Sequence, residues 1–202
     1  AGKTTLFYMI AGLLAIDSGK IYLSGKELNR KSISERTSLG LTYLPQESSI
    51  FRGLTVEANI FSALEQRKDL NHKEIQKELD SLLGNFGLHG LSKTLGIKLS
   101  GGERRRTEIA RSVASNPKFI LLDEPFAGID PIAVSDLKDI IHSLNKKGIG
   151  VLISDHNVRD TMQICDQVLI INQGKLIAQG EPGEVSEDSL VKDVYLGKDF
   201  KQ

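Results

Sequence analysis

Two adjacent carboxylates follow an unbroken apolar run, and their types and position suit chemistry on a phosphate. The run Phe119 to Leu122 is typical of a strand that is buried on both faces of a parallel sheet. Asp123 and Glu124 come directly after it. Carboxylates at a buried strand end are costly unless a cation or a chemical task requires them. We therefore predict that Asp123 holds Mg²⁺ through its water shell and that Glu124 polarises an attacking water molecule.

Two glycine-containing helix starts could bind phosphate. Ser100-Gly101-Gly102-Glu103 fits a capping box, and its successive glycines would let a phosphate approach bare N–H groups. A well-capped helix is the alternative, but it does not explain glycines that lower helix stability. Gly2-Lys3-Thr4 matches the end of a phosphate-binding loop, in which Lys3 reaches the β- and γ-phosphates and the Thr4 hydroxyl binds Mg²⁺. An ordinary helix start is the alternative here. Because the sequence begins at Ala1, we expect the first part of this loop and the strand before it to be missing.

Single polar residues follow two further predicted strands. Gln46 comes after a strand at 41–44, and His156 comes shortly after a strand at 151–153. Proteins of the α/β class place ligand contacts at the carboxyl ends of their strands. Taken singly, Gln46 is as well explained as a surface residue and His156 as a structural histidine. Their place beside Asp123 favours a role in one shared site.

The elements that must position these residues are alternating strands and helices. Strands are predicted at 21–23, 41–44, 119–122 and 151–153, and a hairpin at 168–171 and 175–178. From Ser49 to Lys98 the pattern is one of amphipathic helices instead, with start signals at Thr55 and Asn71, and a further helix starts at Ser100. A further helix is predicted from Asp130-Pro131 to Lys146-Lys147-Gly148, and a helix followed by a loop over 186–200. The pattern indicates an α/β domain with an inserted helical part.

The composition fits one folded domain and argues against several classes of protein. The chain has 202 residues, of which 40% are hydrophobic, and can bury a sizeable core. Its formal net charge of +0 argues against a nucleic-acid partner, because binding the phosphate backbone needs a basic face. The lone Cys165 cannot form an internal disulfide, which favours a reducing compartment. No apolar run has the length of a membrane span, so we expect any membrane role to be peripheral.

Two further features could contact partners. The helix after Ser100 carries a group of arginines, and we predict that they face solvent or another subunit. These arginines are Arg104, Arg105, Arg106 and Arg111. The loop 50–54 is apolar and contains Phe51 and Leu54. Burial in the core is the favoured explanation for this loop, and docking of a partner is the alternative.

Taken together, these motifs resemble those of the ATP-binding subunits of ABC transporters, and the resemblance covers essentially the whole chain. In chain order the matching motifs are the end of the Walker A loop (Gly2 to Thr5), the Q-loop (Gln46), the signature (Leu99 to Glu103), the Walker B strand (Ile120 to Glu124), the D-loop (Ala127 to Asp130) and the switch histidine (His156). Each motif is short, but six in this order are specific. The resemblance implies an α/β P-loop NTPase core, with a parallel sheet of the RecA type, within a single ATPase domain over 1–202. A helical subdomain at about 48–112 would be inserted in this core and carry the signature.

The resemblance also implies how the site residues divide the work, with ATP and Mg²⁺ as the ligands. The catalytic residues would be Glu124 and His156. The nucleotide-binding residues would be Gly2, Lys3, Thr4, Thr5, Gln46, Ser100, Gly101, Gly102 and Asp130. The residues that hold Mg²⁺ would be Thr4, Gln46 and Asp123. Two copies would pack head to tail, so that the signature of one copy completes the ATP site of the other.

The partners that the resemblance implies are two transmembrane permease subunits, which would dock over Gln46 to Leu64. Phe51 and Leu54 would line their groove. The chain would then lie peripherally on the cytoplasmic face of a bacterial inner membrane, with no nucleic-acid partner.

Within the family, the resemblance is to the ATPases of lipopolysaccharide export. The residues that carry it are LSGGERRR at 99–106, Asp155 to Arg159 and Tyr195 to Phe200. ATPases of branched-chain amino-acid importers usually have glutamine after the signature glycines and glutamate before the switch histidine, where this chain has Glu103 and Asp155. Such an importer subunit, or a soluble ABC ATPase outside transport, remains the alternative. A non-hydrolysing subunit would lack the catalytic carboxylate or the switch histidine, and both are present here.

Overall fold

The computed structural model describes residues 2–192, apart from the side chain of Arg159. Its α-helices are α1 (Lys3–Ala11), α2 (Ile33–Ser38), α3 (Val56–Leu64), α4 (His72–Asn85), α5 (Gly101–Ala114), α6 (Pro131–Lys146), α7 (Val158–Met162), α8 (Pro182–Glu187) and α9 (Ser189–Val191). Its strands are β1 (Tyr22–Leu23), β2 (Lys26–Glu27), β3 (Leu41–Leu44), β4 (Phe119–Asp123), β5 (Gly150–Ser154), β6 (Val168–Asn172) and β7 (Lys175–Gly180). Two 3-10 helices lie at His89–Leu91 and Gly96–Lys98. Over 2–192, no helix combines the length and apolarity that crossing a membrane requires. The part of the predicted C-terminal helix and loop beyond residue 192 lies outside the described residues.

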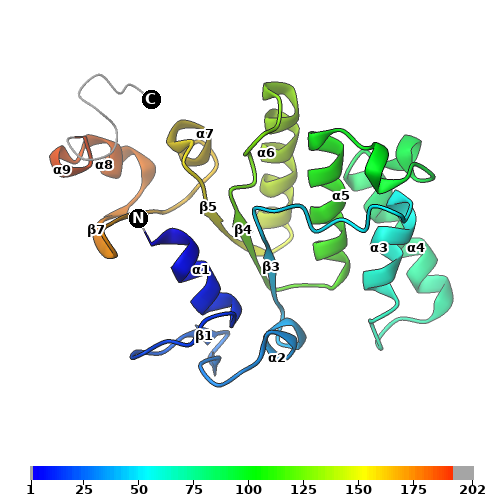
Figure 1. Cartoon of the computed structure of the whole chain (residues 1–202), viewed down its shortest axis with the longest axis horizontal. Helices are drawn as coiled ribbons and strands as arrows, with labels where there is room; N and C mark the ends of the chain where they lie inside the picture. Colours follow the sequence, from blue (N-terminus) through cyan, green and yellow to red (C-terminus); the bar gives the residue numbers. More distant parts are fainter. Residues whose placement is uncertain (1, 193–202) are drawn as a thin grey trace.

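A parallel sheet in the order β3-β4-β5 forms the centre of the fold (Figure 1). Leu44 pairs with Leu122, and Asp123 pairs with Ser154, so the three strands end at the same edge of the sheet. The connections between parallel strands must cross over a face of the sheet, and helices make these crossings. The three strands predicted at 41–44, 119–122 and 151–153 are confirmed, as is the hairpin, which is β6–β7.

The two faces of the sheet are covered by different helices. Along β4, Leu121 packs in a cluster with Phe7 and Leu41, which places α1 on this face. Ile120 and Leu122 pack in the main core with α5 and α6 on the other face. Figure 1 shows α1 on one side of the strands and α5 and α6 on the other. Because successive side chains of a strand point to opposite faces, the alternation along β4 assigns its last residue to the α1 side.

Helices α3, α4 and α5 form a helical lobe beside the sheet, at the right of Figure 1. The predicted start signals at Thr55, Asn71 and Ser100 are confirmed, because each side chain accepts a hydrogen bond from a backbone N–H of the first turn. For the loop before α3 the two alternatives were burial in the core and exposure for docking a partner, and each holds for part of the loop. Ile50 is buried, whereas Phe51 is 51% exposed and Leu54 is 41% exposed.

Candidate functional site

Asp123 ends β4 as a buried carboxylate in which only one of the two oxygens has a hydrogen-bond partner among the described residues. It is 2% exposed, and its Oδ2 accepts a hydrogen bond from the Tyr43 hydroxyl at 3.3 Å. Its Oδ1 is buried and has no hydrogen-bond partner among the described residues. Burial raises the pKa of Tyr43, and the nearby Asp123 charge raises it further, so the phenol stays protonated and donates. A buried carboxylate oxygen without a donor is an open position for a cation or a bound water.

Glu124, the next residue, occupies a backbone conformation that side-chain-bearing residues rarely adopt, with φ of 44°. Its backbone N–H donates to the Ser154 carbonyl at 2.6 Å, which holds the turn after β4 to the end of β5. The Glu124 Oε2 accepts from Gln46 Nε2 at 2.8 Å, and His156 Nδ1 lies 3.4 Å from the same oxygen. Local strain of this kind persists where the surrounding structure fixes a side chain for function. The fold therefore brings two other predicted residues, Gln46 and His156, to one carboxylate oxygen of Glu124.

Lys3 joins this cluster from the first turn of α1. Its ammonium donates to the carbonyl oxygen of Asp155 at 2.8 Å. The buried Asp155 carboxylate in turn accepts from the backbone N–H of Asn157 at 2.8 Å, which shapes the turn that presents His156. Gly2, Thr4 and Thr5 lie exposed at the same helix start. The positive end of a helix with a lysine on its first turn is a ready site for phosphate.

The signature residues lie elsewhere in the chain. Ser100 and Glu103 form the predicted capping box: Glu103 N donates to Ser100 Oγ at 3.4 Å, and Ser100 N donates to Glu103 Oε2 at 2.8 Å. Asp130 caps α6, accepting from Ala133 N at 3.0 Å. Gly101 packs against the segment just before α6. Because α1 and α5 cover opposite faces of the sheet, the signature does not join the Lys3 cluster within one chain.

The structure adds a packing reason for the glycine at position 102. A Cβ at this position would lie 2.5 Å from Ala133 Cβ, because α5 and α6 approach closely there. Close helix packing therefore requires glycine here, independently of any ligand that the signature binds. The sequence pattern could not show this, since the approach of two helices depends on tertiary structure.

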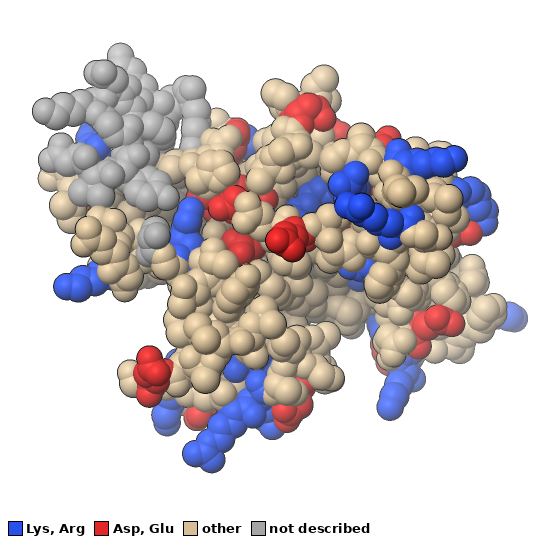
Figure 2. Space-filling model, in the orientation of Figure 1, with Lys and Arg blue, Asp and Glu red and all other residues tan. Residues whose placement is uncertain are grey.

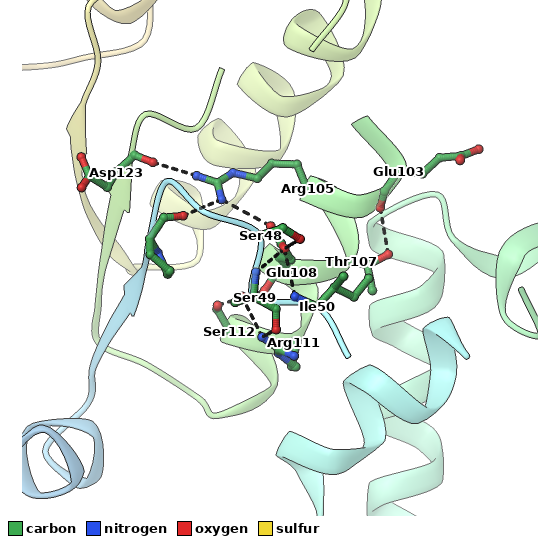
Figure 3. Close-up of polar contacts among 11 residues, drawn as sticks. Ser48, Ser49, Ile50, Glu103, Arg105, Thr107, Glu108, Arg111, Ser112 and Asp123 are labelled. Carbon is green, nitrogen blue, oxygen red and sulfur yellow. Dashed lines mark hydrogen bonds and ion pairs between the residues drawn. The ribbon is translucent and has the colours of Figure 1, made fainter. Parts of the chain in front are cut away.

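The prediction that the arginines of α5 face solvent or another subunit is wrong for Arg105. This side chain is 7% exposed and donates to the carbonyl oxygens of Pro45 at 3.0 Å and Asp123 at 2.9 Å. Its third partner is the carboxylate of Glu108, at 3.3 Å (Figure 3). Burial lowers the pKa of the Arg105 guanidinium, and the Glu108 charge acts in the opposite direction.

Sequence reasoning missed Glu108 altogether. This residue is 2% exposed. The signal was present in the helical spacing, because Arg105, Glu108 and the fully buried Ile109 share one face of α5. Two charged residues on the buried face of a helix pair with each other or with backbone groups.

These features define a class of protein. The sheet edge gathers a cationic helix start, a buried carboxylate with a free oxygen, and a carboxylate held by an amide beside an imidazole. These groups suit the binding of a charged phosphate chain and the activation of water against it. Figure 2 shows acidic side chains gathered over the upper ends of β4 and β5, with charges of both signs interspersed elsewhere on this face. The fold and site are those of an α/β nucleotide hydrolase with a P-loop core.

Comparison with known proteins gives the family. A model of the ABC transporter family matches residues 1–127. The lipopolysaccharide export system ATP-binding protein LptB of Haemophilus influenzae is 53% identical over 201 residues, which cover all of this chain and 83% of the relative. LptB of Escherichia coli is 49% identical over the same coverage. The structure of MJ1267, an ATP-binding cassette of an ABC transporter, matches with a TM-score of 0.85 at 28% identity, covering 97% of this chain and 84% of that one. The chain therefore belongs to the ABC transporter family, as an ATP-hydrolysing subunit.

Proposed function

We propose that this chain powers the extraction of lipopolysaccharide from the inner membrane and its export to the outer membrane. The observation that carries the proposal is the 53% identity to LptB along the whole chain. The Glu103 and Asp155 positions add support, because they depart from the usual importer pattern. The clustered strand-end residues supply the chemistry that such a motor needs.

The nucleotide site forms around the start of α1. Gly2, Lys3, Thr4 and Thr5 bind the phosphates through the backbone N–H groups of the helix start and the Lys3 ammonium. In this structure Lys3 donates to the Asp155 carbonyl instead, so nucleotide binding exchanges that contact for a charge-assisted one. Such bonds to charged groups are the stronger ones.

The residues present fit Mg²⁺. The described residues contain no cluster of three or more acidic, histidine or cysteine ligands, whereas Mg²⁺ in nucleotide sites takes one or two carboxylates and keeps waters and phosphate oxygens. The free Oδ1 of Asp123 supplies such a carboxylate, and Thr4 and Gln46 supply the neutral oxygens. When bound, the metal neutralises charge on the phosphates.

Glu124 and His156 act on the terminal phosphate. Glu124 accepts a proton from the attacking water, whose oxygen bonds to the terminal phosphorus while the bond to the ADP oxygen breaks. Gln46 orients the Glu124 carboxylate through the 2.8 Å hydrogen bond. His156, 68% exposed and 3.4 Å from the same oxygen, is placed to contact the phosphate as it leaves.

A second copy completes the site. The separation of Ser100 to Gly102 from the Lys3 cluster within one chain supports a head-to-tail dimer, in which the signature and Asp130 of one copy meet the nucleotide on the other. Ile132, beside the signature on α6, is 77% exposed, and an apolar side chain of this size suits burial between two copies. Two or three charge-assisted bonds made only to the terminal phosphate would contribute about 3–9 kcal/mol to closure.

The helical subdomain at about 48–112 links this ATPase domain, which spans 1–202, to two permease subunits. The exposed Phe51 and Leu54, next to the Q-loop, line the docking surface within Gln46 to Leu64. The chain then lies on the cytoplasmic face of the inner membrane. The double variant Phe51→Ala and Leu54→Ala should fail to co-purify with membrane subunits; intact assembly would rule out this docking surface.

The test of the transported substrate is to tag the complete gene product in its native cell and identify what co-purifies from membranes in mild detergent. Two permeases together with a periplasmic protein that binds lipid A would support the proposal. Amino-acid permeases would replace it with the importer. The absence of any membrane partner would refute a transport role and leave only the ATPase assignment.

The test of the catalytic residue is Glu124→Gln in the same complete product. ATP binding should persist and the closed dimer should accumulate, while turnover falls by about 100-fold or more. Glu65→Gln, an exposed carboxylate at the end of α3, is the matched control and should hydrolyse ATP normally. Normal turnover in Glu124→Gln would show that another group activates the water.

A further inference from the structure

The carboxylate of Glu108 holds the segment that follows the Q-loop glutamine. Its Oε1 accepts three hydrogen bonds: from Ser48 Oγ at 2.7 Å, from Ser49 N at 2.8 Å and from Ile50 N at 3.1 Å (Figure 3). A carboxylate oxygen binds three such donors more strongly than a neutral acceptor would. The 48–50 segment is therefore attached to α5 through this buried side chain, and Arg111 of the same helix also donates to the carbonyl and hydroxyl oxygens of Ser49, both at 2.8 Å.

The other oxygen of Glu108 ties the same helix to the opposite end of the Q-loop. Oε2 pairs with Arg105 at 3.3 Å, and Arg105 holds the carbonyl oxygen of Pro45. Gln46 and Glu47 thus lie between Pro45 and Ser48, which are both hydrogen-bonded to the Arg105–Glu108 pair. The Gln46 side chain is exposed, and its amide donates to Glu124 at 2.8 Å.

We infer that Glu108 is a positioning residue that sets the Gln46 amide against the Glu124 carboxylate by anchoring the segment 48–50 to α5. The inference rests on the role proposed above for Gln46 and Glu124. Glu108 does not touch the nucleotide site itself; it acts through the loop. Because α5 begins with the signature glycines, the same anchor fixes the position of Gln46 relative to that helix.

Glu108→Gln is the discriminating variant because it keeps the size of the side chain and removes the charge. An amide has one acceptor oxygen and one NH₂ donor. The single amide oxygen of the variant can accept from the three donors of 48–50 or from the Arg105 guanidinium, but not from both. The Q-loop should shift, and the kcat for ATP hydrolysis by the complete gene product should fall about tenfold, the factor to which losing one charge-assisted hydrogen bond corresponds. The KM for ATP should change by less than about twofold.

A double-mutant cycle with Gln46→Ala shows whether Glu108 acts through the Q-loop. In the Gln46→Ala background, Glu108→Gln should lower kcat by less than about twofold, because the group that it positions is already gone. An equal effect in both backgrounds, or no effect in either, would overturn the inference. If Gln46→Ala alone leaves kcat unchanged, the proposed role of Gln46 fails instead.

Two further variants exclude a general effect on folding. Ser112→Ala removes a hydroxyl that bonds only within α5, to the Glu108 carbonyl, and should leave kcat and the cycle unchanged. Ser48→Ala removes one donor without disturbing the buried pair. Its kcat should fall by about two- to threefold, and again only when Gln46 is present. If Glu108→Gln does not fold, the cycle with Ser48→Ala decides the question, and an additive result there refutes the anchor.

Discussion

Replacing Gly102 by alanine would measure how closely the signature helix is packed. The added Cβ would lie 2.5 Å from Ala133 Cβ, whereas carbon atoms in contact prefer about 3.5–4.0 Å. The start of α5 and the first turn of α6 must then separate by about 1 Å. Overpacking costs about 1–3 kcal/mol, and the better helix propensity of alanine returns at most about 1 kcal/mol. We expect a net loss of about 1–2 kcal/mol.

Urea unfolding followed by far-ultraviolet circular dichroism gives the value directly. With a slope of about 2 kcal/mol per molar urea, the midpoint of Gly102→Ala should fall by about 0.5–1 M. Gly101→Ala is the matched control, because its Cβ would lie 3.3 Å from Gly128 O and Ile129 Cγ2, and small shifts relieve such contacts. Its midpoint should move by less than about 0.3 M.

The partner of the clash can be removed as well. Ala133→Gly deletes the facing Cβ, so Gly102→Ala should cost far less in that background, with a coupling energy of about 1 kcal/mol or more. An unchanged or raised midpoint for Gly102→Ala would refute the packing explanation. The glycine would then be required only where a ligand or a second copy approaches.

Three other changes have equally definite outcomes. Lys3→Ala should weaken ATP binding about tenfold or more, measured by isothermal titration, because a charge-assisted contact to the phosphates is lost. Ile120→Ala, fully buried on β4, should lower the free energy of unfolding by about 2–5 kcal/mol, whereas Ile132→Ala, 77% exposed, should stay within about 0.5 kcal/mol in the monomer. A hydrogen bond from the Ser32 backbone, followed by side-chain hydrogen bonds from Lys31 and Ser32, lowers the pKa of Glu35 to about 2. The cap of α2 should therefore persist above the ordinary carboxyl pKa and weaken as the pH falls toward 2, which an NMR titration of the carboxyl carbon would show.

The strands and helix starts were predictable because their signals are local. Largely apolar runs of three or four residues marked β3, β4 and β5, and capping side chains at Thr55, Asn71, Ser100 and Asp130 marked helix starts. Each signal depends on residues within one turn or one strand.

The sequence predicted that Gln46, Glu124 and His156 lie near one another, because the carboxyl ends of parallel strands meet at one edge of a sheet. It did not predict that they are in direct contact. Their contact depends on the order of the strands and on the register between them, and both are properties of the assembled sheet.

By itself, the sequence determined the candidate site residues, their order, and the family to which the chain belongs. The tertiary structure alone decided which partners the buried charges meet and which glycines are needed for packing. Arg105 and Glu108 have the composition of a solvated helix face, yet they lie inside because α5 packs over the loop after β3. A helix has many possible neighbours, and the burial of its polar side chains depends on which neighbour supplies donors and acceptors to match them.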